Sequence, residues 1–191
     1  NTSDVDSVLD ALQASLDGKV LIDHALYLGE VKQIEYLAKQ QRLTFKRSGV
    51  ADPICIKSYQ RLEGFVGLTK ALSMTGQDIV DELKNSGLRG RGGAAFPAGI
   101  KWQTVLDTAG EQKYIVCNAD EGDSGTFADR LLMESDPYQL IEGMTIAGLA
   151  VGANQGYIYL RSEYPVAHKL LNIAIERATD AGFLGANVCN S

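Results

Sequence analysis

The sequence is poor in the residues that build disulfide frameworks and metal centres. Its 191 residues include three cysteines and two histidines. Cys55, Cys117 and Cys189 are widely separated, and none belongs to a CxxC pair. This spacing argues against a disulfide framework, a zinc site or an iron–sulfur cluster within the chain. The two histidines, His24 and His168, are also far apart in the sequence, so no metal site is predicted.

Long apolar runs are also missing. The longest, residues 144–151, is far shorter than the roughly 20 residues of a membrane-spanning helix. Residues 1–10 are polar and acidic, without the basic start and apolar core of a secretory signal. A net charge of −6 makes the chain a poor partner for nucleic acid or for an anionic membrane. We therefore expect a cytoplasmic protein that neither binds nucleic acid nor inserts into a membrane.

Charged residues are distributed unevenly along the chain. Residues 84–106 contain no acid, whereas residues 118–136 contain six acids and a single base. The basic side chains of the first segment are Lys84, Arg89, Arg91 and Lys101. Chance clustering on solvated faces is one explanation. The other is a site that binds an anion through the first segment and hydroxyl groups through the second.

The hydrophobic pattern predicts a mostly helical region over residues 1–74 and an α/β domain over residues 75–191. The expected helices of the first region cover residues 4–16, 28–40 and 58–73, the last capped by Ser58. In the second region we expect a helix capped by Thr75 and Asp78 and ending at Gly87, and a short helix that includes Lys101. Buried strands are expected over residues 113–117 and 156–160. Further helices should start near Thr126, at Pro137 with Asp136 as its cap, and at Pro165.

This order of elements is typical of a Rossmann-like fold, a parallel sheet with helices on both faces. Two strands are few for a parallel sheet, and the chain does not begin with methionine. We therefore expect an incomplete domain that is truncated on its C-terminal side.

Residues 87–99 form a glycine-rich segment in which Gly90, Gly92 and Ala95 satisfy the dinucleotide pattern G-x-G-x-x-G/A. A flexible turn between helices would explain it, because a helix and not a strand is expected before it. Alternatively, backbone N–H groups freed by glycine surround a phosphate, and the following helix and Lys101 add positive charge. Phe96 in this segment either stacks on a flat ligand ring or ties the loop down.

The acidic residues 118–126 follow the first predicted strand directly. Ligands of parallel α/β sheets bind at the carboxyl ends of strands, which is where Asn118 and Asp120 are expected. Such acceptors suit ribityl or ribose hydroxyls and the N–H edge of a flavin. The alternative is a turn in which Asp123 or Ser124 caps the next helix.

Together these blocks resemble the flavoprotein, NADH-binding subunit of respiratory complex I. This family also includes the diaphorase subunits of NAD-reducing hydrogenases and of soluble NAD-dependent formate dehydrogenases. The resemblance covers residues 58–184 and is carried by residues 87–102, 114–126, 129–130, 136–144 and 157–161. Ala94-Ala95-Phe96, residues 123–127 and residues 161–165 are most similar to the formate dehydrogenase branch.

The resemblance implies that the chain binds FMN and NAD(H) and that hydride passes directly between them, so no catalytic acid or base is predicted. Phe96 would stack on the nicotinamide or adenine. Asp123 stands where much of the family has Glu, which contacts a ribose and disfavours NADPH. An acid at this position still repels a 2′-phosphate, so a preference for NAD is implied, and the shorter side chain leaves its strictness open. The full set of predicted cofactor-binding residues is Gly90, Arg91, Gly92, Gly93, Ala94, Phe96, Lys101, Asn118, Asp120, Glu121 and Asp123.

The family continues with a second flavin loop, a ubiquitin-like segment and a domain whose four cysteines hold a [4Fe-4S] cluster. None of these is present in the 191 residues. The implied partners are the iron–sulfur and catalytic subunits of a redox complex, including a thioredoxin-like [2Fe-2S] subunit. Two alternatives stand beside this enzyme subunit. One is a non-catalytic assembly module. The other is a simple NAD-dependent dehydrogenase, which needs a strand before Gly90 and a catalytic His, Lys or Tyr.

Overall fold

The computed structural model describes residues 5–17, 27, 29 and 33–190, and its contacts divide the chain into two units, Asn1–Leu43 and Thr44–Ser191. The first unit contains α1 (Val5–Leu16) and α2 (Glu35–Ala38). Helix α1 confirms the first predicted helix. Within residues 28–40, the described helix is limited to α2, while residues 28 and 30–32 lie outside the described part.

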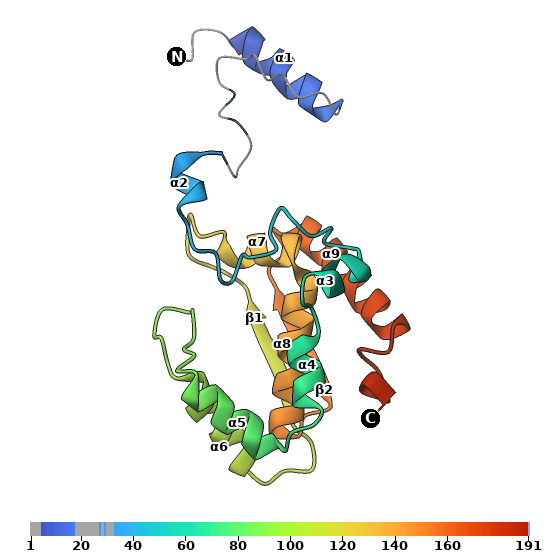
Figure 1. Ribbon diagram of the computed structural model, residues 1–191. Helices are drawn as coiled ribbons and strands as arrows, with labels where there is room; N and C mark the ends of the chain where they lie inside the picture. The colour runs from blue at the N-terminus through green and yellow to red at the C-terminus, as the bar shows by residue number, and fades with distance from the viewer. Residues whose placement is uncertain (1–4, 18–26, 28, 30–32, 191) are drawn as a thin grey trace. The chain divides into compact units, whose positions relative to one another are not determined.

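The second unit has the predicted mixture of helices and parallel strands (Figure 1). Strands β1 (Tyr114–Ala119) and β2 (Gln155–Leu160) pair in parallel, with Tyr114 opposite Gln155. This pairing confirms the α/β class. The helices of the unit are α3 (Ile56–Arg61), α4 (Val66–Ala71), α5 (Gly76–Asn85), α6 (Ala98–Asp107), α7 (Ala128–Ser135), α8 (Pro137–Val151) and α9 (Pro165–Asp180), and a short 3-10 turn (Val188–Asn190) follows.

The predicted helix over residues 58–73 is wrong, because the segment forms two helices, α3 and α4. Glu63 and Phe65 have φ angles of 65° and 62°, which end one helix before the next begins. The Phe65 ring is buried, edge-on to Tyr59 at 5.0 Å and stacked on Phe183 at 3.8 Å between centroids. This aromatic packing overrides helix propensity, and Ser58 lies inside α3 instead of capping it.

The two strands are half-covered, whereas the sequence predicted buried strands. Ile115, Cys117 and Ala119 face the helices and belong to the hydrophobic clusters of the unit. On the opposite face, Val116 and Tyr159 are each 65% exposed, and Tyr114 and Tyr157 are similarly open. Among the described residues, helices therefore cover one face of the sheet. The apolar residues on both faces explain why the sequence indicated burial.

Helix α8 is the centre of the second unit, because it packs against α4, α5, α6, α7, α9 and both strands. Its buried Glu142 carboxylate accepts hydrogen bonds from Tyr59 Oη (2.5 Å) and from the backbone N–H groups of Phe65 (2.8 Å) and Leu68 (2.9 Å). These bonds join residues 44–74 to the rest of the unit. The division at residue 75 into a helical region and a cofactor domain stays a prediction.

A second buried polar contact lies at the start of α8. Pro137 occupies the first position of this helix as predicted, but Asp136 makes no side-chain cap. Its carboxylate instead accepts from Arg47 Nε at 2.7 Å, and Arg47 Nη2 donates to Gln139 Oε1 at 2.6 Å. In the part of the chain described, none of the helices is long and apolar enough to cross a bilayer.

Candidate functional site

The glycine-rich loop is held between two helices. Before it, α5 begins with the predicted capping box, in which Thr75 and Asp78 exchange side-chain and backbone hydrogen bonds. Helix α5 ends before Gly87, whose φ of 67° is the left-handed conformation expected there. The base of the loop is closed by two hydrogen bonds of 2.9 Å, from Gly90 N to Phe96 O and from Ala98 N to Leu88 O. The loop is thus a closed hairpin-like turn that leads into α6.

The tip of this loop has room for a ligand. A Cβ atom added at Gly92 or Gly93 would meet no heavy atom within 4 Å, and Gly93 has a φ of 92°. Ala95 also has a positive φ, of 49°, which an alanine rarely adopts. The backbone at the tip is therefore open and strained, a combination that is frequent at ligand-binding loops.

The charges around the loop fall into two groups. Arg89 Nη1 donates to the carbonyl of Ala95 at 2.9 Å, and Arg91 Nη1 donates to the carbonyl of Arg89 at 3.1 Å, so both arginines stabilise the loop itself. Lys101 lies in the first turn of α6 and is exposed. Within the described residues its ammonium has no ion pair or hydrogen bond, and no side chain caps α6. Lys101 and the positive end of the helix are therefore available to an anion.

Phe96 and Gly99 lie at the other end of the loop. The Phe96 ring is 50% exposed and stacks on no aromatic ring among the residues described, which favours a ligand-stacking role over a staple. Gly99 is buried where α6 crosses α5. A Cβ atom at Gly99 would stand 2.6 Å from Lys84 Cγ and 2.9 Å from Lys84 N. The close approach of the two helices therefore depends on glycine at this position.

We expect Gly99→Ala to lower the free energy of unfolding by about 1–3 kcal/mol, because the added methyl group overlaps the backbone of α5. Urea denaturation followed by far-ultraviolet circular dichroism measures the change. Gly92→Ala is the matched control, since its methyl group enters open space. Equal stabilities for the two variants would contradict the close helix contact.

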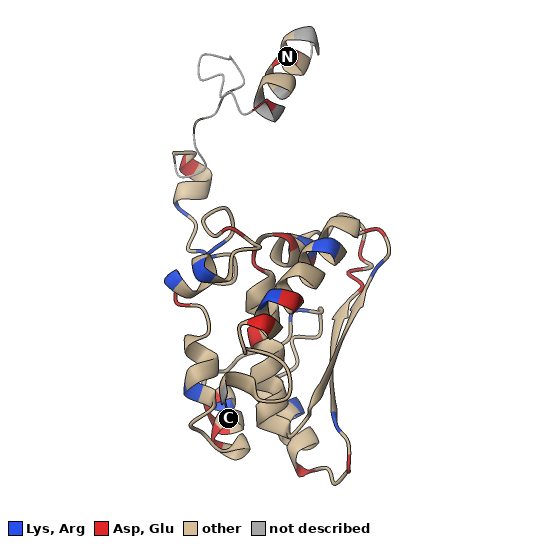
Figure 2. Cartoon of the chain, turned by 90° about the vertical axis from the view of Figure 1, so that its right-hand side faces the viewer, with Lys and Arg blue, Asp and Glu red and all other residues tan. Residues whose placement is uncertain are grey.

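The acidic segment lies at the carboxyl end of β1, as predicted, and Figure 2 shows acidic residues on the loops at the upper ends of the strands. Asn118 Oδ1 accepts from Asp120 N at 3.2 Å, while the Asp120 carboxylate has no hydrogen-bond partner among the described residues. Asp123 is exposed, and its carbonyl accepts from Thr126 N at 3.2 Å in a turn. Asn118 and Asp123 are exposed and Asp120 is half-buried, so their side-chain oxygens can still accept hydrogen bonds from a ligand.

Glu121 behaves differently from its neighbours. Its carboxylate accepts from the backbone N–H groups of Asp129 (2.7 Å) and Arg130 (3.0 Å) and from Tyr164 Oη (2.9 Å). Partial burial tends to raise the pKa of Glu121, but these hydrogen bonds hold it below its usual value. Neither Asp123 nor Ser124 caps α7, so that expectation is wrong. The Glu121 carboxylate caps α7 instead, although Glu121 lies seven residues before the first residue of the helix.

The two predicted halves of the site are not linked directly. Among described residues, no hydrogen bond or ion pair joins residues 87–97 to residues 118–126. In Figure 1 the glycine loop projects beside β1, on the side away from α9. The binding of one cofactor by all eleven predicted residues therefore stays a prediction.

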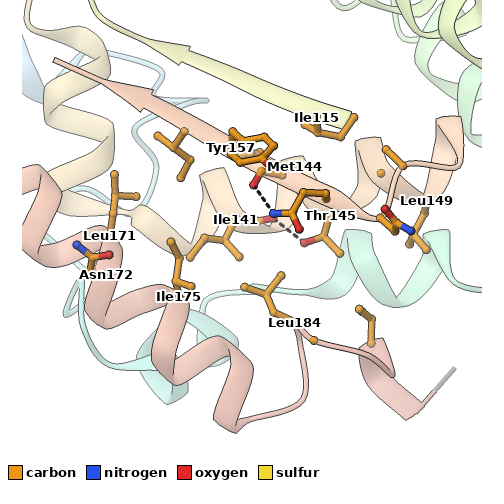
Figure 3. Close-up of a pocket in the computed structure, with 18 of the residues that line it drawn as sticks. Ile115, Ile141, Met144, Thr145, Leu149, Tyr157, Leu171, Asn172, Ile175 and Leu184 are labelled. Carbon is orange, nitrogen blue, oxygen red and sulfur yellow. Dashed lines mark hydrogen bonds between the residues drawn. The ribbon is translucent and has the colours of Figure 1, made fainter. Parts of the chain in front are cut away.

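An apolar groove of about 700 Å³ lies elsewhere, between β2, α8, α9 and the residues after α9. Figure 3 shows Met144 and Leu149 of α8, Ile175 of α9 and Leu184 lining it. The groove contains none of the predicted site residues. In the described part of the chain, no group of three potential ligands forms a metal site.

Parallel strands joined by helices, with a glycine loop before the first strand, define an α/β domain of the Rossmann-like class. Residues 83–190, more than half of the chain, match the model of the Nuo51 FMN-binding domain. The chain belongs to this family, and the match confirms the resemblance inferred from its sequence blocks.

Two relatives show how much of a longer protein the chain represents. It is 50% identical over 153 residues to the HndC subunit of the NADP-reducing hydrogenase of Solidesulfovibrio fructosivorans, covering 80% of this chain and 31% of that protein. It is 48% identical over 136 residues to a subunit of the NADH-quinone oxidoreductase of Aquifex aeolicus, covering 71% of this chain and 32% of that protein. The chain spans about a third of the length of these relatives.

A solved structure supports the fold. The crystal structure of NAD+-reducing [NiFe]-hydrogenase in the air-oxidized state matches with a TM-score of 0.61 and 27% sequence identity. The match covers 96% of this chain and 30% of the hydrogenase chain. The relatives are thus named as subunits or chains of redox enzymes.

Proposed function

We propose that this chain forms the phosphate-binding part of an FMN site in an NAD(H)-oxidoreductase subunit. The observation that carries the proposal is the open loop at the uncapped start of α6, beside the Lys101 ammonium, which has no partner among the residues described. The surrounding segment contains no acid that would repel a phosphate. Membership of the FMN-binding family supports the same assignment.

The residues have separate roles in this proposal. Gly90, Gly92, Gly93 and Lys101 hold the phosphate, together with the backbone of Arg91 and Ala94. Asn118 and Asp120 accept hydrogen bonds from hydroxyls or from the ring edge, Phe96 stacks on the nicotinamide or adenine of NAD(H), and Asp123 disfavours a 2′-phosphate by charge. Bound FMN would supply hydride exchange with the nicotinamide. The side chains of the protein hold the flavin and nicotinamide rings in the orientation that hydride transfer requires.

We also propose partners and a setting for the parent enzyme. The names of the relatives, which are subunits of a hydrogenase and of an oxidoreductase, support a multi-subunit redox complex. Iron–sulfur subunits, one of them a thioredoxin-like [2Fe-2S] protein, stay the partners that the family resemblance implies. A [4Fe-4S] cluster would lie outside these residues, and the complex would work in the cytoplasm. The formate dehydrogenase branch stays a prediction that rests on Ala94-Ala95-Phe96 and residues 123–127 and 161–165.

Titration of the chain with FMN, followed by quenching of flavin fluorescence, tests the proposal. We expect saturable quenching that Gly92→Trp abolishes, because the indole occupies the open tip, where an added Cβ meets no heavy atom within 4 Å. Gly143→Trp is the matched control, because an added Cβ there also meets no heavy atom within 4 Å and the position lies outside the proposed site, so this variant should bind FMN normally. If no protein quenches the flavin, the chain does not hold FMN by itself.

That negative result would favour a non-catalytic assembly module. One observation supports this second candidate, namely the sheet face formed by Tyr114, Val116, Tyr157 and Tyr159, which no described element covers. The simple dehydrogenase is disfavoured, because helix α5 and not a strand leads into the glycine loop.

A further inference from the structure

Two neighbouring carboxylates at the end of β1 have opposite surroundings. Asp120 has no hydrogen-bond partner among the residues described, whereas Glu121 accepts three hydrogen bonds. We propose that Glu121, Arg161 and Tyr164, which we call the strand-end latch, order this loop so that Asp120 meets the cofactor. Glu121 is then a positioning residue and not a direct ligand. This inference rests on the proposed FMN-binding function.

The first part of the latch is Glu121 itself. Its φ of 44° is unusual for a glutamate and turns the chain sharply after Asp120. Its carboxylate then occupies the start of α7 by accepting from the N–H groups of Asp129 and Arg130. A carboxylate that serves as a helix cap has few acceptor positions left for a ligand.

The second part of the latch comes from the segment after β2. Tyr164 is 4% exposed, and its hydroxyl donates to the Glu121 carboxylate at 2.9 Å. Its ring lies beside two guanidinium groups, 5.2 Å from Arg161 and 5.4 Å from Arg130. Arg161 Nη1 also donates to the Glu121 carbonyl at 2.7 Å. Both the carboxylate and the backbone of Glu121 are therefore held by the segment that follows β2.

The latch fixes Asp120 because the chain around it has little freedom. Asp120 lies between Glu121 and the last residue of β1, Ala119, whose carbonyl accepts from Arg161 N at 3.5 Å. A Cβ atom at Gly122 would stand 3.0 Å from Asp120 Oδ2. The Asp120 carboxylate therefore lies close to the backbone of Gly122, where a side chain would crowd it. Hydrogen bonds from Arg161 and Tyr164 thus fix the residues on both sides of Asp120. Among the described residues, the Asp120 carboxylate is left as the free acceptor.

The test is a double-variant cycle in FMN affinity measured on the full chain. Tyr164→Phe removes one hydroxyl and keeps the ring beside its arginines, and Asp120→Asn weakens the proposed ligand. We expect Tyr164→Phe to weaken FMN binding about tenfold, as loss of one hydrogen bond to a charged group predicts. Because Tyr164 acts through Asp120, Tyr164→Phe should have little further effect in the Asp120→Asn background. Tyr157→Phe, an exposed tyrosine on the sheet face, is the matched control and should bind FMN normally.

Additive effects of the two substitutions, or normal FMN affinity in Tyr164→Phe, would overturn the positioning role. Failure of the parent chain to bind FMN would instead reject the proposed function. In that case amide hydrogen exchange of residues 118–130 decides whether the latch exists. Tyr164→Phe should accelerate this exchange about tenfold, and unchanged exchange would reject the latch as well.

Discussion

Glu142→Leu is expected to lower the free energy of unfolding by at least about 3 kcal/mol. The substitution leaves the Tyr59 hydroxyl and the N–H groups of Phe65 and Leu68 without their acceptor, and each orphaned buried donor costs about 1–3 kcal/mol. Burial, and then the hydrogen bond to Glu142, raises the pKa of Tyr59, so its hydroxyl is a donor throughout the accessible pH range. Urea unfolding followed by circular dichroism measures the loss.

An exposed glutamate provides the comparison. Glu82 pairs with Lys70 at 2.6 Å, but both side chains are about 60% exposed. Glu82→Leu should therefore change stability by no more than about 1 kcal/mol. A Glu142→Leu variant as stable as Glu82→Leu would show that the buried hydrogen bonds do not hold α4 against α8.

Arg47→Met is expected to cost about 3–5 kcal/mol near neutral pH, because it leaves Asp136 as a buried charge without its partner. The Asp136 side chain is 2% exposed and that of Arg47 is 12% exposed, so water replaces little of the lost interaction. Arg47 also packs over the Tyr59 ring at 4.6 Å. Methionine keeps part of this packing but also removes the hydrogen bonds from Arg47 to Gln139 Oε1 and to the Leu62 carbonyl.

The loss should depend on pH in a definite direction. Burial raises the pKa of Asp136, while Arg47 opposes the rise. Without Arg47 the pKa of Asp136 rises further above its unfolded value, so the folded state binds the proton more strongly than the unfolded state. The variant should therefore regain stability relative to the parent as the pH falls through that raised pKa, and lose it again as the pH rises.

Denaturation at several pH values, on the parent and on Arg47→Met, measures this difference. Adding Asp136→Asn to Arg47→Met should restore part of the stability and remove most of the pH dependence. A loss that is the same at every pH would show that Asp136 is not the source of the destabilisation.

Features set by neighbouring residues could be predicted from the sequence. The Thr75–Asp78 capping box, the left-handed Gly87 and Pro137 at the start of α8 are local, and each stands where the pattern placed it. The order of strands and helices was enough to predict parallel pairing of β1 with β2. These signals depend on residues a few positions apart, within reach of pattern arguments.

Features set by distant contacts could not be predicted. The break between α3 and α4 depends on Phe65 stacking on Phe183. Asp136 was expected to cap its own helix, but its partner Arg47 is 89 residues away. Exposure of one sheet face also has no local signal, because the strand residues are apolar on both faces.

The candidate site shows the same limit. The glycine loop, Lys101 and the strand-end acids lie on the predicted elements, since each follows directly from the element order. The role of Glu121 depends on Tyr164, which is 43 residues away, and no spacing rule connects them. Adjacent acids of one motif can therefore have different functions that become visible only when the second strand is placed.

The half-covered sheet has a consequence for the behaviour of the chain in solution. Within the described residues each strand has one partner, so each leaves an outer edge whose N–H and C=O groups can pair with another chain. The β2 sequence Gln-Gly-Tyr-Ile-Tyr-Leu carries no lysine, arginine or proline, which are the residues that commonly protect such edges. An element or partner that pairs with this edge would therefore also protect the chain against aggregation.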